Sequence, residues 1–435
     1  MRHEQFRYKT LDDVKAAMRD AKADFPLSDN TSLLEKPYEF GSRGAANRIL
    51  FQPMEGSDSE DDGSPGELTF RRYERYAGGG PGILWVEAIS IAREARASKN
   101  QLFMNAKNVD SFKRLVERAK ETCIRNNGFE PLLIIQSAHS GRYSKPGGVP
   151  APLIACNNPL FEKDNPLPAD RIISDDELGA LPDLFGESAR LSALAGFDGI
   201  DIKACHRYLL NELLCAHARD GIYGGGFENR TRLLIEAFAA AGAAAPAGFM
   251  LTTRLNVYDG FPYPYGFGVN EEGGPGPDLS EPLRLIGILK EKFGIELINI
   301  TAGNPYVNPH VTRPFDKGLY VPEEHPFEGV ARITGFAGEV QKKYPDIAVA
   351  CSGLSYLRGF SDKLAAGMLE SGAAEFAGFG RLALAYPDFP ADIFADGRLD
   401  SGKVCLTCGL CSRLLRAGKS SGCVVRDREV YKWTE

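Results

Sequence analysis

The sequence predicts an α/β protein with a (β/α)8 barrel, and three observations support this prediction. Short apolar runs rich in β-formers recur eight times along the chain, and they lack the period-2 alternation of half-exposed strands. Helix-like segments separate them, as in proteins built from repeated β/α units. The runs are NRILFQPM (47–54), GILWVEA (82–88), PLLIIQS (131–137), FDGIDIKA (197–204), GFMLTTRLN (248–256), IELINITAG (295–303), DIAVACSG (346–353) and AAEFAGFGR (373–381).

Amphipathic segments between the runs complete the β/α units. Residues 109–127 and 228–244 carry apolar residues at helical spacing, and the segment 280–294 ends on a glycine, a typical helix stop signal. A further helix is expected over residues 10–25, with Thr10 as its N-cap. We therefore divide the chain into an N-terminal extension (1–47), the barrel (48–398) and a C-terminal four-cysteine segment (399–435).

Composition and charge narrow the class of protein. The 435 residues are 43% hydrophobic and 25% charged, which is typical of a globular chain with a sizeable core. A net charge of −7 argues against nucleic acid as the main partner, because phosphate binding requires a basic surface. The sequence starts without an apolar signal-peptide region, and its most apolar stretch is too short to cross a bilayer. We expect a cytoplasmic protein with no membrane partner, in which clustered cysteines bind metal or act in catalysis.

The ends of the predicted strands carry the reactive residues, since active sites of such barrels lie at the C-terminal ends of the strands. The loops after the seventh and eighth strands usually bind phosphate, and small residues there let backbone N–H groups approach phosphate oxygens. In this sequence those positions are Ser352, Gly353, Gly380 and Arg381, and the arginine would add a bidentate charge. Glycines that only pack tightly are the alternative.

Two polar side chains lie at the ends of otherwise apolar strands. Gln136 ends the third strand, and Arg254 lies on the fifth. A buried arginine needs a partner, and the pyrimidine edge of a flavin, which gains negative charge on reduction, would supply one. An internal ion pair is the alternative interpretation.

Lys203, His206 and Tyr208 lie within six residues at the end of the fourth strand. Residues 203 and 205 share a face of the strand, so the backbone must turn before His206 for the three side chains to converge. Together they would bind a carbonyl oxygen and deliver a proton, and a well-placed general acid is worth roughly 10²–10⁴ in rate. A tyrosine that pairs with a histidine in the core is the alternative.

At these residues the sequence resembles the Old Yellow Enzyme family of FMN-dependent ene-reductases. The resemblance covers roughly residues 37–395 and rests on specific segments in the family's order. They are NRILFQPM, QSAHSGRY, GFDGIDIKACHRYLLNELL followed by YGGGFENRTR, TTRLNVYDGF and GFGRLALAYPDFP. AHSGRY, YLLNELL and the cysteine-rich tail are similar to the branch with 2,4-dienoyl-CoA reductase and trimethylamine dehydrogenase, whose members carry a 4Fe-4S cluster after the barrel.

The resemblance implies an FMN site at the mouth of the barrel. The residues implied to hold the phosphate are Ser352, Gly353, Gly380 and Arg381. Those implied to hold the pyrimidine ring are Gln136 and Arg254. The isoalloxazine would be flanked by Pro53, Met54 and Glu55, with Ala88 beneath it.

The resemblance also implies catalytic roles, with two departures from the family pattern. Tyr208 matches the family's proton donor, and His206 matches the second residue of the pair that grips the substrate oxygen. The first residue of that pair is usually His and here is Lys203, whose pKa shifts readily. Glu55 stands where the family usually has Thr or Cys, and a carboxylate there would disfavour the reduced flavin unless it is protonated.

Four cysteines near the C-terminus have the spacing C-x2-C-x2-C-x11-C. The compact triplet is typical of cubane clusters, whose fourth cysteine closes the cage from further along the chain. A structural zinc would more often use two separated C-x2-C pairs, so zinc is the weaker interpretation, and a segment without metal is a third. The ligands of the predicted 4Fe-4S cluster are Cys405, Cys408, Cys411 and Cys423.

The predicted function is that of a flavin-dependent oxidoreductase acting on C=C bonds. Lys203 and His206 would hold the oxygen of an α,β-unsaturated carbonyl, enoate or dienoyl substrate, reduced FMN would give hydride to the β-carbon, and Tyr208 would protonate the α-carbon. His310, in NPYVNPH, is either a substrate or proton-relay residue or a loop histidine that caps backbone. The two cluster-bearing relatives continue into nucleotide-binding domains, which we do not find here. We therefore expect electrons from NAD(P)H bound over the FMN, or from a separate ferredoxin or flavoprotein.

Three other functions stay open at this point. An amine dehydrogenase or demethylase of the trimethylamine dehydrogenase type would need an aromatic cage for a cationic substrate, and Lys203 argues against it. A metal-dependent barrel hydrolase with a zinc tail would need His or carboxylate ligands at several strand ends. A non-catalytic electron-transfer subunit would not need Tyr208. Association into a homo-oligomer is also left open by the sequence.

Overall fold

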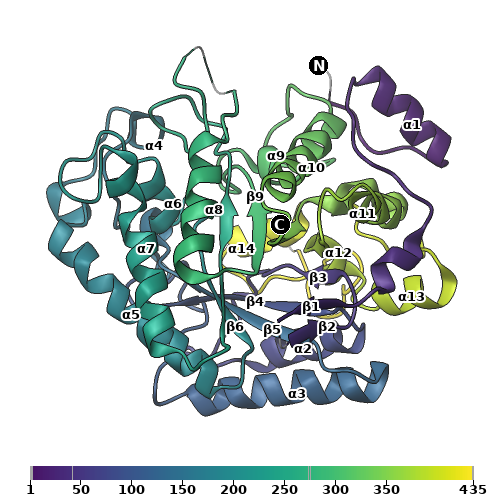
Figure 1. The fold of residues 1–435 in the computed structure, drawn as a ribbon, viewed down its shortest axis with the longest axis horizontal. Coiled ribbons are helices and arrows are strands. Elements are labelled where there is room, and N and C mark those ends of the chain that lie inside the picture. Colours follow the sequence, from purple (N-terminus) through teal and green to yellow (C-terminus); the bar gives the residue numbers. More distant parts are fainter. Residues whose placement is uncertain (1–2, 42, 273, 275, 434–435) are drawn as a thin grey trace.

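A parallel β-barrel lies at the centre of the computed structural model, which describes residues 3–41, 43–272, 274 and 276–433 (Figure 1). The strands pair side by side in the order β7-β6-β5-β4-β3-β11-β10-β9-β8. Their bounds are β3 (Ile49–Phe51), β4 (Ile83–Ser90), β5 (Leu132–Ala138), β6 (Gly199–Ile202), β7 (Met250–Thr252), β8 (Arg254–Asn256), β9 (Leu297–Thr301), β10 (Ala348–Cys351) and β11 (Phe376–Phe379). The predicted (β/α)8 barrel is confirmed, and each of the eight predicted runs contributes a strand.

The fifth predicted strand is divided into β7 and β8 at Thr253. β7 pairs with β6 and β8 pairs with β9, so the two short pieces occupy one position of the barrel. Thr253 still joins both neighbours, because its hydroxyl donates to the Ile202 carbonyl at 2.7 Å and its carbonyl accepts from the Asn299 N–H at 3.1 Å. The nine strand segments therefore occupy the eight strand positions of the barrel.

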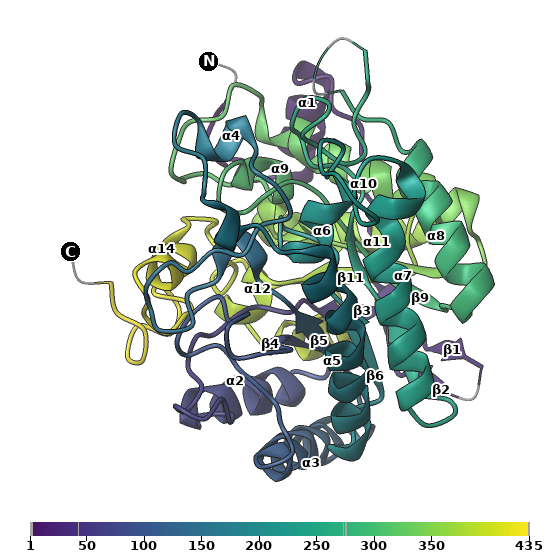
Figure 2. The ribbon, with the colours of Figure 1, turned by 90° about the vertical axis from the view of Figure 1, so that its left-hand side faces the viewer.

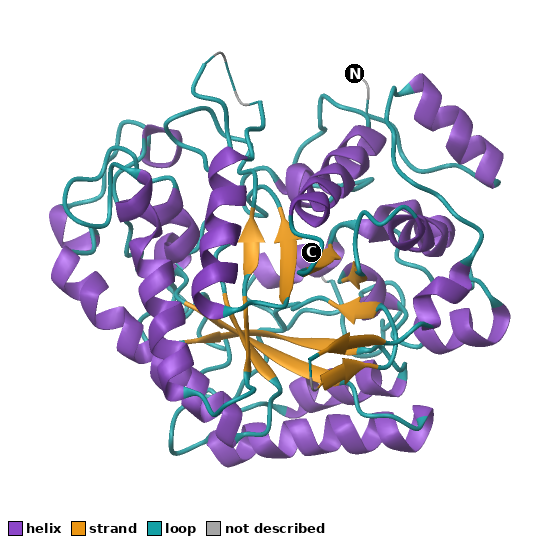
Figure 3. Ribbon diagram, in the orientation of Figure 1, coloured by secondary structure: helices purple, strands orange, loops and turns teal. Residues whose placement is uncertain are grey.

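Helices surround the strands on the outside of the barrel, as Figure 3 shows by colour. The long ones are α2 (Glu67–Gly78), α3 (Val109–Asn127), α5 (Asp175–Leu194), α7 (Phe227–Ala244), α8 (Ser280–Phe293), α10 (Pro326–Lys343) and α11 (Ser361–Glu370). The short ones are α4 (Pro159–Glu162), α6 (Leu209–Leu214), α9 (Pro309–Thr312), α12 (Arg381–Ala385), α13 (Phe389–Asp396) and α14 (Leu410–Arg416). In the described part of the chain, no helix has both the length and the apolar character needed to cross a membrane.

Local sequence signals place several helix ends where we expected them. α3 covers the whole predicted range, and α8 stops at Gly294, which adopts the left-handed conformation with φ of 62°. At the N-terminus, α1 (Leu11–Asp20) begins after Thr10, whose hydroxyl accepts from the Asp13 N–H at 3.1 Å.

The N-terminal end of the barrel is closed by a hairpin of β1 (Tyr38–Phe40) and β2 (Arg43–Ala45). Phe40 stacks on Phe376 of β11 with a centroid separation of 5.7 Å, and both belong to a buried apolar cluster with Trp85. Because this end is filled with packed side chains, the opposite end, where the strands reach their C-termini, is the one open to chemistry.

A pair of buried amide side chains inside the barrel requires a glycine at position 378. The Gln52 and Asn299 side chains pair reciprocally across the barrel, with N···O distances of 3.2 and 2.8 Å. A Cβ at Gly378 would lie only 2.6 Å from the Cys351 carbonyl oxygen and would also collide with the Gln52 amide. A side chain at this position would therefore displace the pair.

We expect Gly378→Ala to lower the free energy of unfolding by about 1–3 kcal/mol, the usual cost of overpacking a closely packed interior. The measurement is urea unfolding followed by circular dichroism. Gly335→Ala on α10 is the matched control, because nothing lies within 4 Å of the added Cβ. It should be neutral or stabilising by up to about 1 kcal/mol. Equal stability of the two variants would contradict the prediction.

Candidate active site

A cavity of about 610 Å³ opens at the C-terminal ends of the strands. All ten residues predicted to bind the cofactor, and all three predicted to be catalytic, line it. They are Pro53, Met54, Glu55, Ala88, Gln136, Arg254, Ser352, Gly353, Gly380 and Arg381, together with Lys203, His206 and Tyr208. Their roles stay predictions, but the barrel brings these distant parts of the sequence to one place.

One end of the cavity is strongly cationic. Arg381 donates through one nitrogen to the Pro314 carbonyl at 2.9 Å, whereas its other terminal nitrogen is buried and has no hydrogen-bond partner among the described residues. Arg313, which the sequence analysis missed, lines the same end and donates to the Ser412 hydroxyl at 2.9 Å. Burial and the neighbouring Arg381 guanidinium lower the pKa of Arg313 to about 10. Two close guanidinium groups with an unused donor fit a phosphate.

Glycines shape the same end. Gly353 has φ of 83°, a conformation that favours glycine. A Cβ at Gly380 would lie 2.6 Å from the Met54 sulfur. The Ser352 hydroxyl donates to the Ile300 carbonyl at 2.8 Å, which leaves that hydroxyl hydrogen unavailable to a ligand. Backbone groups and arginines, rather than this hydroxyl, would therefore donate to a phosphate here.

Gln136 and Arg254 meet at a shared buried carboxylate, Asp201. The Asp201 side chain accepts from the Gln136 amide at 2.6 Å and from the Arg254 backbone N–H at 2.7 Å. Burial raises the pKa of Asp201 to about 6. The Arg254 guanidinium itself forms no ion pair in the described residues, and its Nε is buried without a partner. The internal ion pair that we considered as an alternative is therefore not seen.

Lys203, Tyr208 and Glu55 form a buried cluster at the centre of the cavity. The Lys203 ammonium lies 3.6 Å from the centroid of the Tyr208 ring. The Tyr208 hydroxyl is 3.5 Å from a Glu55 oxygen and 3.2 Å from the Tyr306 hydroxyl. Burial raises the pKa of Glu55 and lowers that of Lys203, so both groups are shifted toward their neutral forms.

His206 lies beside this cluster with an unused ring nitrogen. Its Nε2 is buried and has no hydrogen-bond partner among the described residues. Burial and the nearby cations Arg254 and Lys203 lower the pKa of His206 well below its usual value. The imidazole is therefore neutral at physiological pH.

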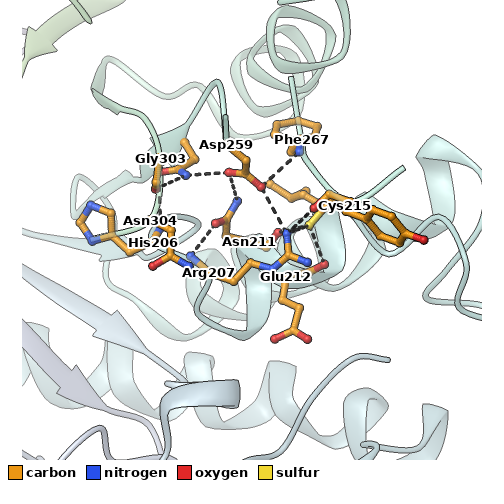
Figure 4. A network of polar contacts seen from close by, with 12 residues as sticks. His206, Arg207, Asn211, Glu212, Cys215, Asp259, Phe267, Gly303 and Asn304 are labelled. Atoms are coloured by element: carbon orange, nitrogen blue, oxygen red, sulfur yellow. Dashed lines mark hydrogen bonds and ion pairs between the residues drawn. The ribbon is translucent and has the colours of Figure 1, made fainter. Parts of the chain in front are cut away.

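The backbone turn that brings these side chains together is unusual, because His206 and Arg207 both have positive φ, 65° and 60°. Arg207 fixes the turn by donating to the Tyr265 carbonyl at 2.7 Å and by pairing with the buried Asp259 at 3.6 Å. Asp259 also accepts from the Asn256 amide at 2.7 Å. It accepts from the Asn211 amide at 3.3 Å as well (Figure 4). We expected a turn before His206, but nothing in the sequence analysis assigned Arg207 and Asp259 to it.

Tyrosines form one wall of the cavity, and the sequence analysis did not assign two of them. Tyr143 and Tyr306 stack with their centroids 3.8 Å apart, and the Asn304 amide donates to the Tyr143 hydroxyl at 2.7 Å. Both tyrosines lie in segments that we quoted, QSAHSGRY and NPYVNPH. Their positions just after strand ends were the signal that could have identified them.

His310 is the predicted site residue that the structure does not bring to the cavity. It is buried behind the lining, with its Nε2 3.3 Å from Glu324 and its ring 5.1 Å from that of Phe315. Its backbone N–H donates to the Tyr320 hydroxyl at 3.4 Å. These contacts hold the loop between β9 and α10, whereas Tyr306 from the same loop reaches the cavity.

The four predicted ligand cysteines line a second, small cavity. Cys405 is buried, and the other three are partly exposed. Among the described residues, no three His, Cys, Asp or Glu side chains are close enough to hold a single metal ion. Cys411 lines the large cavity as well, and Leu415 and Arg416 of α14 form part of its wall. The four-cysteine segment thus contributes directly to the candidate active site.

A family model described as NADH:flavin oxidoreductase / NADH oxidase matches residues 33–265, more than half of the chain. This chain belongs to that family. It is therefore an enzyme, a flavin oxidoreductase of a family that uses nicotinamide electron donors, and the resemblance to Old Yellow Enzymes is confirmed.

Named relatives extend the comparison. An NADPH dehydrogenase of Clostridium acetobutylicum is 28% identical over 261 residues, which cover 59% of this chain and 70% of that protein. A cinnamate reductase of Clostridium sporogenes is 25% identical over 392 residues, which cover 88% of this chain but 55% of that protein.

Solved structures share the fold. 2-Naphthoyl-CoA reductase superimposes with a TM-score of 0.74 at 18% identity, over 92% of this chain and 57% of that chain. An Old Yellow Enzyme homologue from Zymomonas mobilis gives a TM-score of 0.62 at 22% identity, over 84% of this chain and 94% of that chain. This chain thus spans little more than half the length of 2-naphthoyl-CoA reductase and of the cinnamate reductase.

The Arg207–Asp259 pair yields a stability prediction. Asp259→Ala removes a carboxylate that compensates a buried guanidinium, so we expect the free energy of unfolding to fall by about 3–5 kcal/mol. Glu187→Ala is the control, because Glu187 pairs with Arg190 at 2.7 Å on the exposed surface. It should cost under about 1 kcal/mol. Urea unfolding measures both, and similar losses would show that the buried pair does not hold the turn.

Proposed function

We propose that this protein is an FMN-dependent ene-reductase that reduces the activated C=C bond of an α,β-unsaturated carbonyl, enoate or dienoyl substrate. The observation that carries the proposal is the buried cluster of Tyr208, Lys203 and Glu55, in which a phenol lies against an ammonium and a carboxyl group. The similarity to a cinnamate reductase supports an enoate as substrate.

The cavity fits FMN on three observations of the chain itself. The cationic end has an unused Arg381 donor, the Arg254 guanidinium has no ion-pair partner in the described residues, and Gly380 leaves no room for a side chain. Arg381, Arg313 and the Gly353 and Gly380 backbones would hold the phosphate, and Gln136 and Arg254 the pyrimidine ring. Bound in this cavity, FMN would supply hydride to the substrate's β-carbon.

The side chains beside the flavin site would hold the substrate oxygen. Lys203 is a donor, and the neutral His206 ring has an Nε2 with no partner in the protein. A neutral imidazole carries its proton on only one of its two nitrogens. To donate a hydrogen bond to the substrate oxygen, His206 must carry that proton on Nε2. A lysine–imidazole pair of this kind suits a carbonyl or carboxylate oxygen.

Tyr208 would deliver the proton to the α-carbon. Its side chain is 1% exposed, so water does not compete for the phenolic proton. Loss of that proton leaves a phenolate, which the Lys203 ammonium over the ring would stabilise. The raised pKa of Glu55 keeps its carboxyl group protonated at a higher pH than usual, and from 3.5 Å it would return a proton to the phenolate.

The same cluster disfavours an amine dehydrogenase. The tyrosine wall of Tyr143, Tyr208 and Tyr306 offers aromatic faces, but the protein's own Lys203 ammonium already lies over the Tyr208 ring. A cationic substrate would be repelled there. A metal-dependent hydrolase has no support from the described residues, since none of their His, Cys, Asp and Glu side chains gather around a single-ion site.

We further propose that residues 399–435 bind a 4Fe-4S cluster through Cys405, Cys408, Cys411 and Cys423. These cysteines line one cavity, and their compact C-x2-C-x2-C triplet followed by a distant fourth cysteine favours a cluster over zinc. Thiolate ligands also favour a reducing cytoplasmic setting. Electrons would come from NAD(P)H or from a reduced electron-transfer protein.

The proposed function yields three predictions, and the first concerns cofactor content. Protein purified anaerobically should contain about one FMN and, for a 4Fe-4S cluster, about four irons and four acid-labile sulfides per chain. Visible absorbance, metal analysis and chromatography of the released flavin measure these quantities. Cys408→Ser should lose iron while keeping FMN. Zinc in place of iron would overturn the cluster, and the absence of any flavin would overturn the ene-reductase.

The second prediction concerns the proton donor. Tyr208→Phe should lower the rate of cinnamate or 2-cyclohexenone reduction, with reduced methyl viologen as electron source, by roughly 10²–10⁴. Bound FMN should be unchanged. Tyr223→Phe is the control, because this hydroxyl bonds to Glu236 at 2.9 Å, outside the cavity lining. An unchanged rate in Tyr208→Phe would point to another proton donor, whereas no substrate reduction by the wild type would point to a non-catalytic electron-transfer subunit.

The third prediction tests whether Glu55 returns the proton to Tyr208, with Glu55→Gln as the variant. Its raised pKa means that Glu55 is protonated at low pH and ionises as the pH rises through that value. Wild-type activity should therefore fall over that rise, whereas the Gln variant should be slower and lack this limb of the pH profile. An identical pH profile in both proteins would exclude Glu55 from proton return.

A further inference from the structure

A cationic hollow lies beside the four-cysteine cavity. Five basic side chains line it, and no carboxylate does so in the described part of the chain. They are Arg313, Lys317, Arg381, Arg413 and Arg416. Arg381 and Gly409 line both this hollow and the cysteine cavity, so the two are adjacent. Lys317, Arg413 and Arg416 are exposed and carry the charge that a partner would meet, whereas Arg313 and Arg381 also line the large cavity, where they would hold the FMN phosphate.

This charge contrasts with the rest of the protein. Residues 399–435 contain seven basic and four acidic residues, whereas the whole chain has a net charge of −7. Two acidic groups of the neighbouring sequence are engaged in ion pairs, since Asp427 pairs with Arg71 and Arg75, and Asp316, next to Lys317 in the chain, pairs with Arg358. An acidic partner would therefore be attracted to this face and repelled by the rest of the surface.

Exposed apolar side chains border the hollow. Leu319, Tyr320 and Val321 are 57%, 38% and 59% exposed, and Leu319 is part of its lining. The loop that carries them is anchored, because the Tyr320 hydroxyl accepts from the His310 N–H and the Lys317 carbonyl lies against Gly409 at the start of α14. An ordered apolar patch ringed by cations is typical of a protein interface.

We propose that this face, formed by α14 and residues 317–321, docks an acidic one-electron carrier protein of the ferredoxin class. The inference rests on the proposed function and names its electron donor. Reduction of one C=C bond takes two electrons and two protons, so the carrier would dock twice in each turnover and leave oxidised each time. Electrostatic attraction sets the approach, and the apolar patch fits the brief contact of such partners.

The test measures binding of an acidic bacterial ferredoxin with a single 4Fe-4S cluster to the holoenzyme by calorimetry at low and high salt. The test variant is Lys317→Glu with Arg413→Glu, two exposed residues outside the lining of the large cavity. The control, Lys113→Glu with Arg114→Glu, makes the same charge change on α3, away from α14 (Figure 2). We expect the test variant to bind about tenfold or more weakly, the control to bind as wild type, and salt to weaken wild-type binding.

Equal losses in the two double variants, salt-independent affinity, or no binding of ferredoxin to the wild-type holoenzyme would each overturn the inference. A basic cytochrome c that binds as tightly as the ferredoxin would also do so. Substrate reduction with reduced methyl viologen is measured on the same samples. Its failure would overturn the proposed function, whereas the ferredoxin affinity decides the docking face independently of turnover.

Discussion

Buried positive charge without carboxylate partners is the constraint around which this molecule is organised. Arg381 and Arg254 both keep buried nitrogens with no partner in the described part of the chain, and burial together with the Arg381 guanidinium lowers the pKa of Arg313 to about 10. A protein does not gain stability from such an arrangement, because each desolvated cation costs free energy until an anion is bound beside it. In the proposed function, the phosphate and the pyrimidine ring of FMN would supply the missing partners.

The turn after β6 is held in a strained backbone conformation. Two consecutive residues, His206 and Arg207, are held in the left-handed region, and the buried Asp259 network over-determines their conformation (Figure 4). Because of this turn, the neutral His206 lies beside Lys203, and Tyr208 lines the same cavity. The strained backbone and the proposed catalytic residues therefore lie in one short segment.

The barrel was predictable because it depends on local patterns. Apolar runs mark β3 to β11, and caps such as Thr10 and Gly294 mark helix ends. The residues lining the cavity were predictable for a related reason, because every barrel strand ends at the same rim. What the sequence could not reveal depends on contacts across loops. Tyr306 rather than His310 enters the cavity because stacking on Tyr143 draws it inward, and Asp259 reaches Arg207 only through the fold.

The four-cysteine segment contacts the loop that carries Glu55. The Gly56 carbonyl accepts from the Ser421 N–H at 2.7 Å, and the Gly56 N–H donates to the buried Glu87 at 2.6 Å. Gly56 follows Glu55, so the loop that carries the carboxyl group beside Tyr208 is held between the barrel and the cysteine segment. A segment that only covered the outside of the barrel would need no contact with the Glu55–Gly56 loop. Because the segment forms part of the cavity wall, the residues proposed to deliver the proton and the proposed point of electron entry belong to one packed unit.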